Sequence, residues 1–312
     1  CMIWPNNKSF ALTIIDDTDF ATIENIKPVY DYLYNNGIIS TKTVWTYSCR
    51  DSFKGQSLAD CDYLAFIRDL SQKGFEIASH GAGSGLFTRE EILASLEDFK
   101  NKIGYYPNIF INHASNSDCI YWGVERFSSI FRFLYIFARK VLRKKQIKSG
   151  GSNPDSISFW GDVCKEKIQY IRGCTFNAIN TLKIDRRMPF IVKKRIEYSN
   201  FWFSSSDGRN CEEFCRLLSA KNINSLEREH GLCIVYTHFA YGFYKNGKLD
   251  DKFINCIDYL ATKNGYYAPA SEILNYLKNS QKKNIYMNFF PELFYNIKWF
   301  CDRIIKEIRG KF

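Results

Sequence analysis

Several signatures are missing from the 312-residue sequence, and each missing signature excludes a class of protein. No pattern repeats at a period of about 20 to 50 residues and no tract is of low complexity, which excludes solenoids and propellers. The most apolar stretch, residues 127–142, is interrupted by Arg132, Arg139 and Lys140, which makes it a poor membrane span. Residues 1–15 lack a basic leader, a long apolar segment and a cleavage site, so no secretory signal is expected.

The eleven cysteines have no regular spacing, which argues against a disulfide framework. Cys211 and Cys215 lie one helical turn apart, but no second close pair completes a zinc site. Scattered thiols in a reducing compartment are the simpler interpretation, so we expect a cytoplasmic protein.

The formal net charge is +10, and basic residues concentrate at 140–148 and 298–311. Such a field would suit nucleic acid, an anionic membrane surface or an acidic glycan, whereas two solvated helix faces are the alternative. No helix-turn-helix, zinc-finger or RNA-recognition signature is present, so we expect no nucleic-acid partner. Aromatic residues make up 17% of the chain, which fits sugar stacking as well as a large core.

Short runs rich in β-branched and aromatic residues recur along the chain, with helical patterns between several of them. This alternation favours a mainly parallel sheet with helical crossovers. Seven runs fit an α/β fold, a distorted (β/α) barrel of about seven parallel strands, and a doubly wound open sheet is the alternative. The expected strands are Phe10–Ile15, Lys42–Thr46, Phe75–Ser79, Asn108–Asn112, Cys174–Ile179, Phe201–Ser205 and Leu232–Thr237. The expected helices are Ile23–Tyr34, Leu58–Leu70, Arg89–Lys100, Cys211–Ser219 and Asp251–Lys263.

Two segments depart from this alternation of strands and helices. Residues 120–172 separate the fourth and fifth expected strands and contain a basic helix, so we expect an inserted lid over the active face of the barrel. The barrel itself is expected within residues 1–279. Residues 280–312 have the pattern of an amphipathic helix with a basic face. Packing on the barrel, contact with the inner face of an anionic membrane, and partner binding all remain open for this helix.

The first strand ends in a cluster of carboxylates, Asp16, Asp17 and Asp19. Like charges this close raise one another's pKa unless a cation compensates, and a divalent metal is the simplest cation. An aspartate-rich turn that caps the next helix is the alternative.

Histidine is scarce, and three of the four histidines follow expected strands. His80, His113 and His238 each come directly after a strand, whereas His230 precedes one. Because the carboxyl ends of parallel strands gather at one face of a barrel, these three rings and the aspartates should meet there.

These positions resemble motifs of the polysaccharide deacetylase family, the NodB-homology carbohydrate esterases. The run from Thr13 to Asp17 is similar to the first motif, and that from Gly74 to His80 to the second. The run ending in His238 looks like the last motif. The resemblance implies Asp16 as general base, Asp17 and His80 as metal ligands, and His238 as general acid.

One position departs from the family pattern. The second motif carries another histidine four residues after the first, and this chain has Ser84 there. A catalytic zinc site usually needs three protein ligands, so we expect His113 to replace the missing one, with Glu76 as a weaker substitute. If neither serves, the protein is a non-catalytic glycan-binding pseudoenzyme.

The resemblance, to a divergent WbmS-like branch in particular, implies a metal-dependent carbohydrate deacetylase. It would remove an N-acetyl group from a sugar in surface polysaccharide or glycolipid biosynthesis, with zinc as the expected cofactor. The sugar could be free, lipid-linked or nucleotide-linked, and an amidase reaction on peptidoglycan is a further alternative. We expect the substrate to be bound by Asp19, Asn112, Trp160, Ser205 and Asp207, with Trp122 and Trp202 as further stacking candidates.

Overall fold

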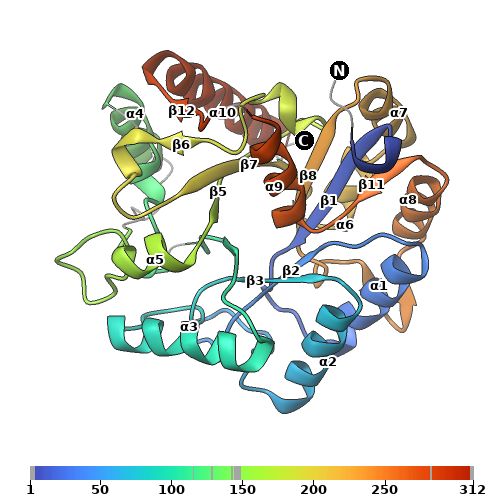
Figure 1. Cartoon of the computed structure of the whole chain (residues 1–312), viewed down its shortest axis with the longest axis horizontal. Helices are drawn as coiled ribbons and strands as arrows, with labels where there is room; N and C mark the ends of the chain where they lie inside the picture. Colours follow the sequence, from blue (N-terminus) through green and yellow to red (C-terminus); the bar gives the residue numbers. More distant parts are fainter. Residues whose placement is uncertain are drawn as a thin grey trace.

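Seven parallel strands close into a barrel in the computed structural model, which describes residues 4–114, 116–127, 129–141, 143, 149–281 and 283–309 (Figure 1). The order is β1-β2-β3-β4-β5-β7-β8, and β8 pairs with β1 from Ala11 beside Leu232 to Asp16 beside Thr237. This closure confirms the predicted seven-stranded (β/α) barrel and excludes the open sheet. The strands are β1 (Phe10–Asp16), β2 (Thr41–Val44), β3 (Glu76–Ser79), β4 (Ile109–Phe110), β5 (Tyr170–Phe176), β7 (Phe201–Asp207) and β8 (Leu232–Thr237).

Helices between the strands cover the outside of the barrel (Figure 1). The five predicted helices are present, with ends shifted by up to three residues, and Thr88 forms the expected capping box with Glu91. These helices are amphipathic and bury their apolar stripes against the strands. The outer helices are α1 (Ile23–Asn35), α2 (Cys61–Gln72), α3 (Arg89–Ile103), α5 (Gly161–Lys167), α6 (Cys211–Leu217), α7 (Ala220–Arg228) and α8 (Asp251–Ala261).

Side chains of β1 alternate between the two faces of the barrel wall. Phe10, Leu12 and Ile14 join the core beneath the outer helices, whereas Ala11 and Ile15 belong to the other core cluster. Because the alternation has a period of two, the two aspartates that end this run must face opposite sides.

The amino ends of the strands are closed by α9 (Ala270–Ser280), which crosses in front of the barrel in Figure 1. The backbone N–H of Ala270 donates to Thr41 Oγ1, and that of Ser271 donates to Glu76 Oε2. Glu76 therefore lies at the end opposite to the histidines, which excludes it as the substitute metal ligand. A short strand that the sequence did not predict, β11 (Gly265–Tyr267), pairs with the start of β1.

The long insertion and the last helix pack on each other beside the barrel (Figure 1). Phe127, Phe131 and Tyr135 of the insertion form one aromatic cluster with Trp299. Residues 144–148 of the predicted basic helix lie outside the described residues, and none of the described helices is long and apolar enough to cross a bilayer. This region contains α4 (Ser129–Val141), β6 (Ile191–Val192), β12 (Tyr286–Met287) and α10 (Phe289–Arg309).

Short elements complete the described chain. They are the 3-10 turns η1 (Pro5–Asn7), η2 (Gly123–Arg126), η3 (Thr181–Lys183) and η4 (Lys193–Arg195), and the hairpin β9 (Tyr244–Lys245) and β10 (Lys248–Leu249).

Docking of α10 on the barrel can be tested with Trp299→Ala. Trp299 is buried and packs 5.0 Å from the ring of Phe127, so its truncation should lower the free energy of unfolding by about 3 kcal/mol or more. Phe294→Ala on the same helix is the control, because Phe294 is 69% exposed and should change stability by less than about 1 kcal/mol. Urea denaturation measures both. Equal small effects would show that α10 is undocked in solution.

Candidate metal centre

The carboxyl ends of the barrel strands surround a cavity of about 350 Å³. Asp17 and Asp19 follow β1, His113 follows β4, and His238 follows β8, as their positions after strands predict. The cavity is therefore built from loops of several strands, where catalytic groups of barrel enzymes collect. Its lining includes Asp17, Asp19, His113, Arg172, His238 and Tyr241.

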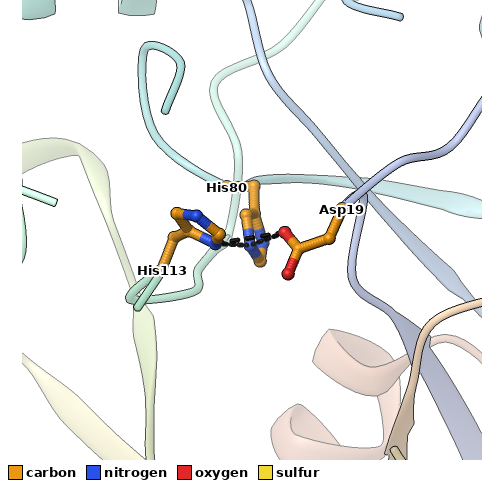
Figure 2. Close-up of side chains that lie close together, drawn as sticks. All are labelled: Asp19, His80 and His113. Atoms are coloured by element: carbon orange, nitrogen blue, oxygen red, sulfur yellow. Dashed lines mark hydrogen bonds and ion pairs between the residues drawn. The ribbon is translucent and has the colours of Figure 1, made fainter. Parts of the chain in front are cut away.

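Three buried side chains converge beside this cavity: Asp19 and His113, which line it, and His80, which is not part of the lining. His113 Nδ1 lies 3.1 Å from Asp19 Oδ1, and His80 Nε2 lies 3.5 Å from the same oxygen. The two ring nitrogens are 3.2 Å apart. Figure 2 shows the two rings and the carboxylate turned toward one another from three separate segments of the chain.

Hydroxyl groups behind the two rings fix which nitrogen of each carries the proton. Thr43 Oγ1 donates to the backbone carbonyl of Asp16, so it accepts from His80 Nδ1, which is 3.1 Å away. Ser84 Oγ donates to Asp51 and likewise accepts from His113 Nε2 at 3.2 Å. His80 Nε2 and His113 Nδ1 therefore both present lone pairs to the cluster.

A cation fits this arrangement better than a hydrogen-bond network does. Two lone pairs and the carboxylate oxygen of Asp19 face one another, and this oxygen has no hydrogen-bond partner among the described residues. Ligand atoms bound to one tetrahedral zinc ion lie about 3.3 Å apart, close to the three observed separations. Two imidazoles and a carboxylate are also a donor set typical of zinc.

The ionisation of the cluster agrees with metal binding. Burial would raise the pKa of Asp19, but the surrounding histidine rings, when protonated, lower it well below its usual value, so the group stays a carboxylate. Burial lowers the pKa of His80, which keeps that ring neutral. A carboxylate and a neutral imidazole are the forms that bind metals.

Asp16 lies on the other side of the barrel wall, away from this cavity. One oxygen accepts from Lys42 Nζ at 2.8 Å and from Tyr30 at 3.0 Å, and the other accepts from the backbone N–H of Phe239 at 2.8 Å. Asp16 and Lys42 are fully buried. The expected role of Asp16 as general base does not fit this placement, which follows from the alternation of β1.

Asp17 faces the cavity and forms a two-pronged ion pair with Arg172 of β5. The oxygens of Asp17 lie 2.8 and 2.5 Å from the guanidinium nitrogens. Burial raises the pKa of Asp17, but Arg172 together with His80 and His238 outweighs it and lowers the pKa, so Asp17 is ionised at neutral pH. The carboxylate expected as a metal ligand is thus held by an arginine instead.

His238 lies between Asp19 and the rim of the cavity. Its Nε2 is 3.1 Å from Asp19 Oδ2, and its Nδ1 is 2.8 Å from the backbone carbonyl of Arg209. Burial lowers the pKa of His238, but the hydrogen bond to Asp19 and the charge of Asp17 outweigh it, so the pKa is raised. Both ring nitrogens have an acceptor within reach, which favours the protonated ring.

The residues expected to bind substrate are distributed unevenly. Asn112 lines the cavity, although its amide is bonded to the backbone of Ile120. Asp207 binds Arg303 and Lys306 of α10. Trp160 and Ser205 are buried away from the cavity lining, and Trp160 donates to a backbone carbonyl.

Sequence reasoning missed Arg172 because the fifth strand was expected to begin at Cys174, whereas β5 begins at Tyr170. The signal in the sequence that could have identified this residue is an arginine within an apolar, strand-like run. The cavity wall also contains Trp122, a stacking candidate, while Trp202 is buried in the core. Further lining residues without an assigned role are Phe53, Arg126, Arg209, Tyr236, Trp299 and Arg303.

The sequence itself matches no protein-family model. No curated protein matches it either. Solved structures do: a protein assigned as a polysaccharide deacetylase from Mycobacterium smegmatis has a TM-score of 0.52 at 11% identity, with 92% of this chain and 96% of that chain covered. The Puue allantoinase has a TM-score of 0.56 at 10% identity, with 90% and 94% covered. A second assigned polysaccharide deacetylase, from Pseudomonas aeruginosa PAO1, has 0.53 at 10% identity, with 90% and 95% covered.

The fold is that of the polysaccharide deacetylases. At these identities the likeness shows the fold alone, so the chemistry must be argued from the residues described above.

The metal centre predicts a distinct pattern of metal loss. Each of the single variants His80→Ala and His113→Ala should bind about one metal ion per chain fewer than wild type, as measured by elemental analysis. Ser84→Ala should keep that ion with about 10-fold weaker affinity, because only the support behind His113 is lost. His230→Ala is the control, since His230 bonds Ser9 at the amino end of the barrel.

Wild-type protein that binds no ion after addition of zinc, cobalt or nickel would rule out the centre. Loss of metal in His230→Ala to the same extent would assign the binding to another site.

Proposed function

We propose that this protein is a metal-dependent hydrolase that removes an N-acetyl group from an amino sugar. The observation that supports this most directly is the convergence of Asp19, His80 and His113 beside the Asp17–Arg172 pair and His238. A metal site, an ionised carboxylate and a protonated imidazole around one cavity are the groups that amide hydrolysis requires. The polysaccharide-deacetylase fold agrees with this reaction.

The proposed roles fall on different residues from those that the resemblance implies. Asp19, His80 and His113 would hold the ion, so His113 takes the place of the histidine replaced by Ser84. Asp17 takes the role of base, because it faces the cavity and is ionised. Ser84 supports His113 from behind and is not itself a ligand.

A bound divalent ion supplies a Lewis acid that polarises the acetyl carbonyl and lowers the pKa of a nearby water. Asp17 accepts the proton of the attacking water at a carboxylate oxygen, and Arg172 fixes the orientation of that carboxylate. His238 donates its Nε2 proton to the leaving amine nitrogen, and Arg209 O holds the ring through Nδ1. Acetate and the free amino sugar are the products.

The charge of the cavity favours a substrate with an anionic carrier. Arg126, Arg209 and Arg303 line it in addition to Arg172, and no carboxylate partner is found for Arg126 or Arg209 in the described chain. The guanidinium of Arg126 lies 4.0 Å from the ring centre of Trp122, which leaves its N–H edge available. A phosphate of a lipid- or nucleotide-linked sugar would match these donors. This supports a role in surface polysaccharide or glycolipid biosynthesis, as in the WbmS-like branch.

Asp17→Asn tests the proposed reaction. It should lower the turnover of an N-acetylated amino sugar at least about 100-fold while the metal content stays unchanged, because the base is lost and the ligands remain. Asp185→Asn is a matched control, since Asp185 forms the same two-pronged pair with Arg187 outside the cavity. Acetate release is measured with free, nucleotide-linked and lipid-pyrophosphate-linked N-acetyl sugars.

Full activity in Asp17→Asn would refute the assigned base. Binding of the sugars without acetate release from any of them by wild-type protein would instead favour the glycan-binding alternative.

We further propose that the protein is cytoplasmic and touches the inner face of the membrane through α4 and α10. Both helices expose large apolar side chains while their other faces pack together. Phe137 is 57% exposed and Phe294 is 69% exposed. Basic side chains such as Lys140 and Lys298 accompany them, which matches an anionic lipid surface.

Vesicle flotation checks this contact. The protein should bind vesicles containing anionic lipid more strongly than neutral ones, and Phe137→Glu with Phe294→Glu should weaken binding about 10-fold or more. Leu86→Glu is the control, because Leu86 is 57% exposed on a different surface segment. Equal weakening by the control, or no binding to anionic vesicles, would contradict the proposal.

A further inference from the structure

A second group of metal-binding side chains lies in the outer helical layer. Cys211 and Cys215 occupy the same face of α6, one turn apart, and their sulfur atoms are 3.9 Å from each other. No second pair of cysteines lies close to this one in the sequence, so the spacing alone did not predict a metal site. In the fold, further donors lie beside the pair.

The missing donors come from α8, which packs against α6. Asp250 is the N-cap of α8, and one of its carboxylate oxygens lies within 4.8 Å of both sulfur atoms. Cys256 belongs to α8 and interacts with Cys215. Two helices thus bring two thiols and one carboxylate within ligand distance of one another, with Cys256 next to Cys215 and its thiol donating to the backbone carbonyl of Leu218 at 3.4 Å.

The geometry fits one ion. Two sulfur atoms bound to the same tetrahedral zinc at about 2.3 Å lie about 3.8 Å apart, and the observed separation is 3.9 Å. A disulfide would need the sulfur atoms at about 2.05 Å. Asp250 Oδ1 accepts from the backbone N–H groups of Lys252 and Phe253, which leaves its other oxygen free to bind.

The hydrogen bond with Cys211 lowers the pKa of Cys215, but the interaction with Cys256 and burial outweigh it and raise the pKa to about 12, so this thiol is protonated when no metal is bound. A bound divalent ion displaces that proton, as it does wherever a thiol becomes a metal ligand.

We propose that Cys211, Cys215 and Asp250 hold a structural zinc-type divalent ion, separate from the candidate metal centre, and that Cys256 turns its thiol from the carbonyl of Leu218 to supply the fourth ligand. With four protein ligands the site is closed and has no position for substrate. It joins α6 to α8. Because α6 begins two residues after Arg209, whose carbonyl orients His238, the site would also fix the backbone that positions this ring.

Cobalt binding to metal-depleted, reduced wild-type protein tests the site, because sulfur ligands produce an intense charge-transfer absorption that nitrogen and oxygen ligands do not. The expected result is about two cobalt ions per chain, one of which develops the sulfur band. Cys215→Ser should lose the band and about one ion, and His80→Ala should keep the band. Cys61→Ser, at an exposed cysteine on α2, is the control and should bind as wild type does.

A second measurement needs no variant. Zinc added to the wild-type protein should protect Cys211 and Cys215 from alkylation, as read by peptide mass mapping, while exposed Cys61 stays reactive. A protein that binds cobalt without the sulfur band, or thiols that react equally with and without zinc, would overturn the proposal. Neither result would affect the proposed hydrolase, whose ion is held without sulfur.

Discussion

Neighbouring residues of a strand point to opposite faces, and β1 ends on two adjacent aspartates. Asp16 is therefore directed outward and Asp17 inward, although the sequence shows them as equivalent. The outward carboxylate forms a buried pair with Lys42, and the inward one forms a pair with Arg172. Removal of either partner would leave a buried charge, which typically costs about 3–5 kcal/mol. The next carboxylate, Asp19, can then reach the histidines.

The departure at Ser84 becomes understandable from its contacts. This chain lacks the histidine that the family pattern has at this position. The ring of His113 lies next to Ser84 instead. Ser84 accepts from His113 and donates to Asp51, so it sets the tautomer and orientation of the replacing ring. Thr43 does the same for His80 from β2. In the proposed centre, a change that first suggests loss of the metal would thus be part of an alternative ligand set.

The sequence predicted the barrel and the place of the site because both depend on local patterns. Apolar runs marked all seven strands, and the residues after them marked the cavity. The sequence could not assign Asp16 and Asp17 to opposite faces, because every residue from Phe10 to Ile15 is buried and no polar contrast reveals the alternation. Arg172 and the α6–α8 cysteine cluster depend on contacts between distant segments, which spacing along the chain does not reveal.

Closure of the barrel pairs β1 with β8. The closed barrel therefore cannot form until Leu232–Thr237 has been synthesised. Asp19, His80 and His113 are all present once a little over a third of the chain has been synthesised, whereas His238 and the α10 part of the cavity wall come much later. The three proposed metal donors can therefore meet on the incomplete sheet before His238, the proposed proton donor, has been synthesised. In the proposed mechanism, the site would then pass through a stage that could hold an ion and could not complete the reaction.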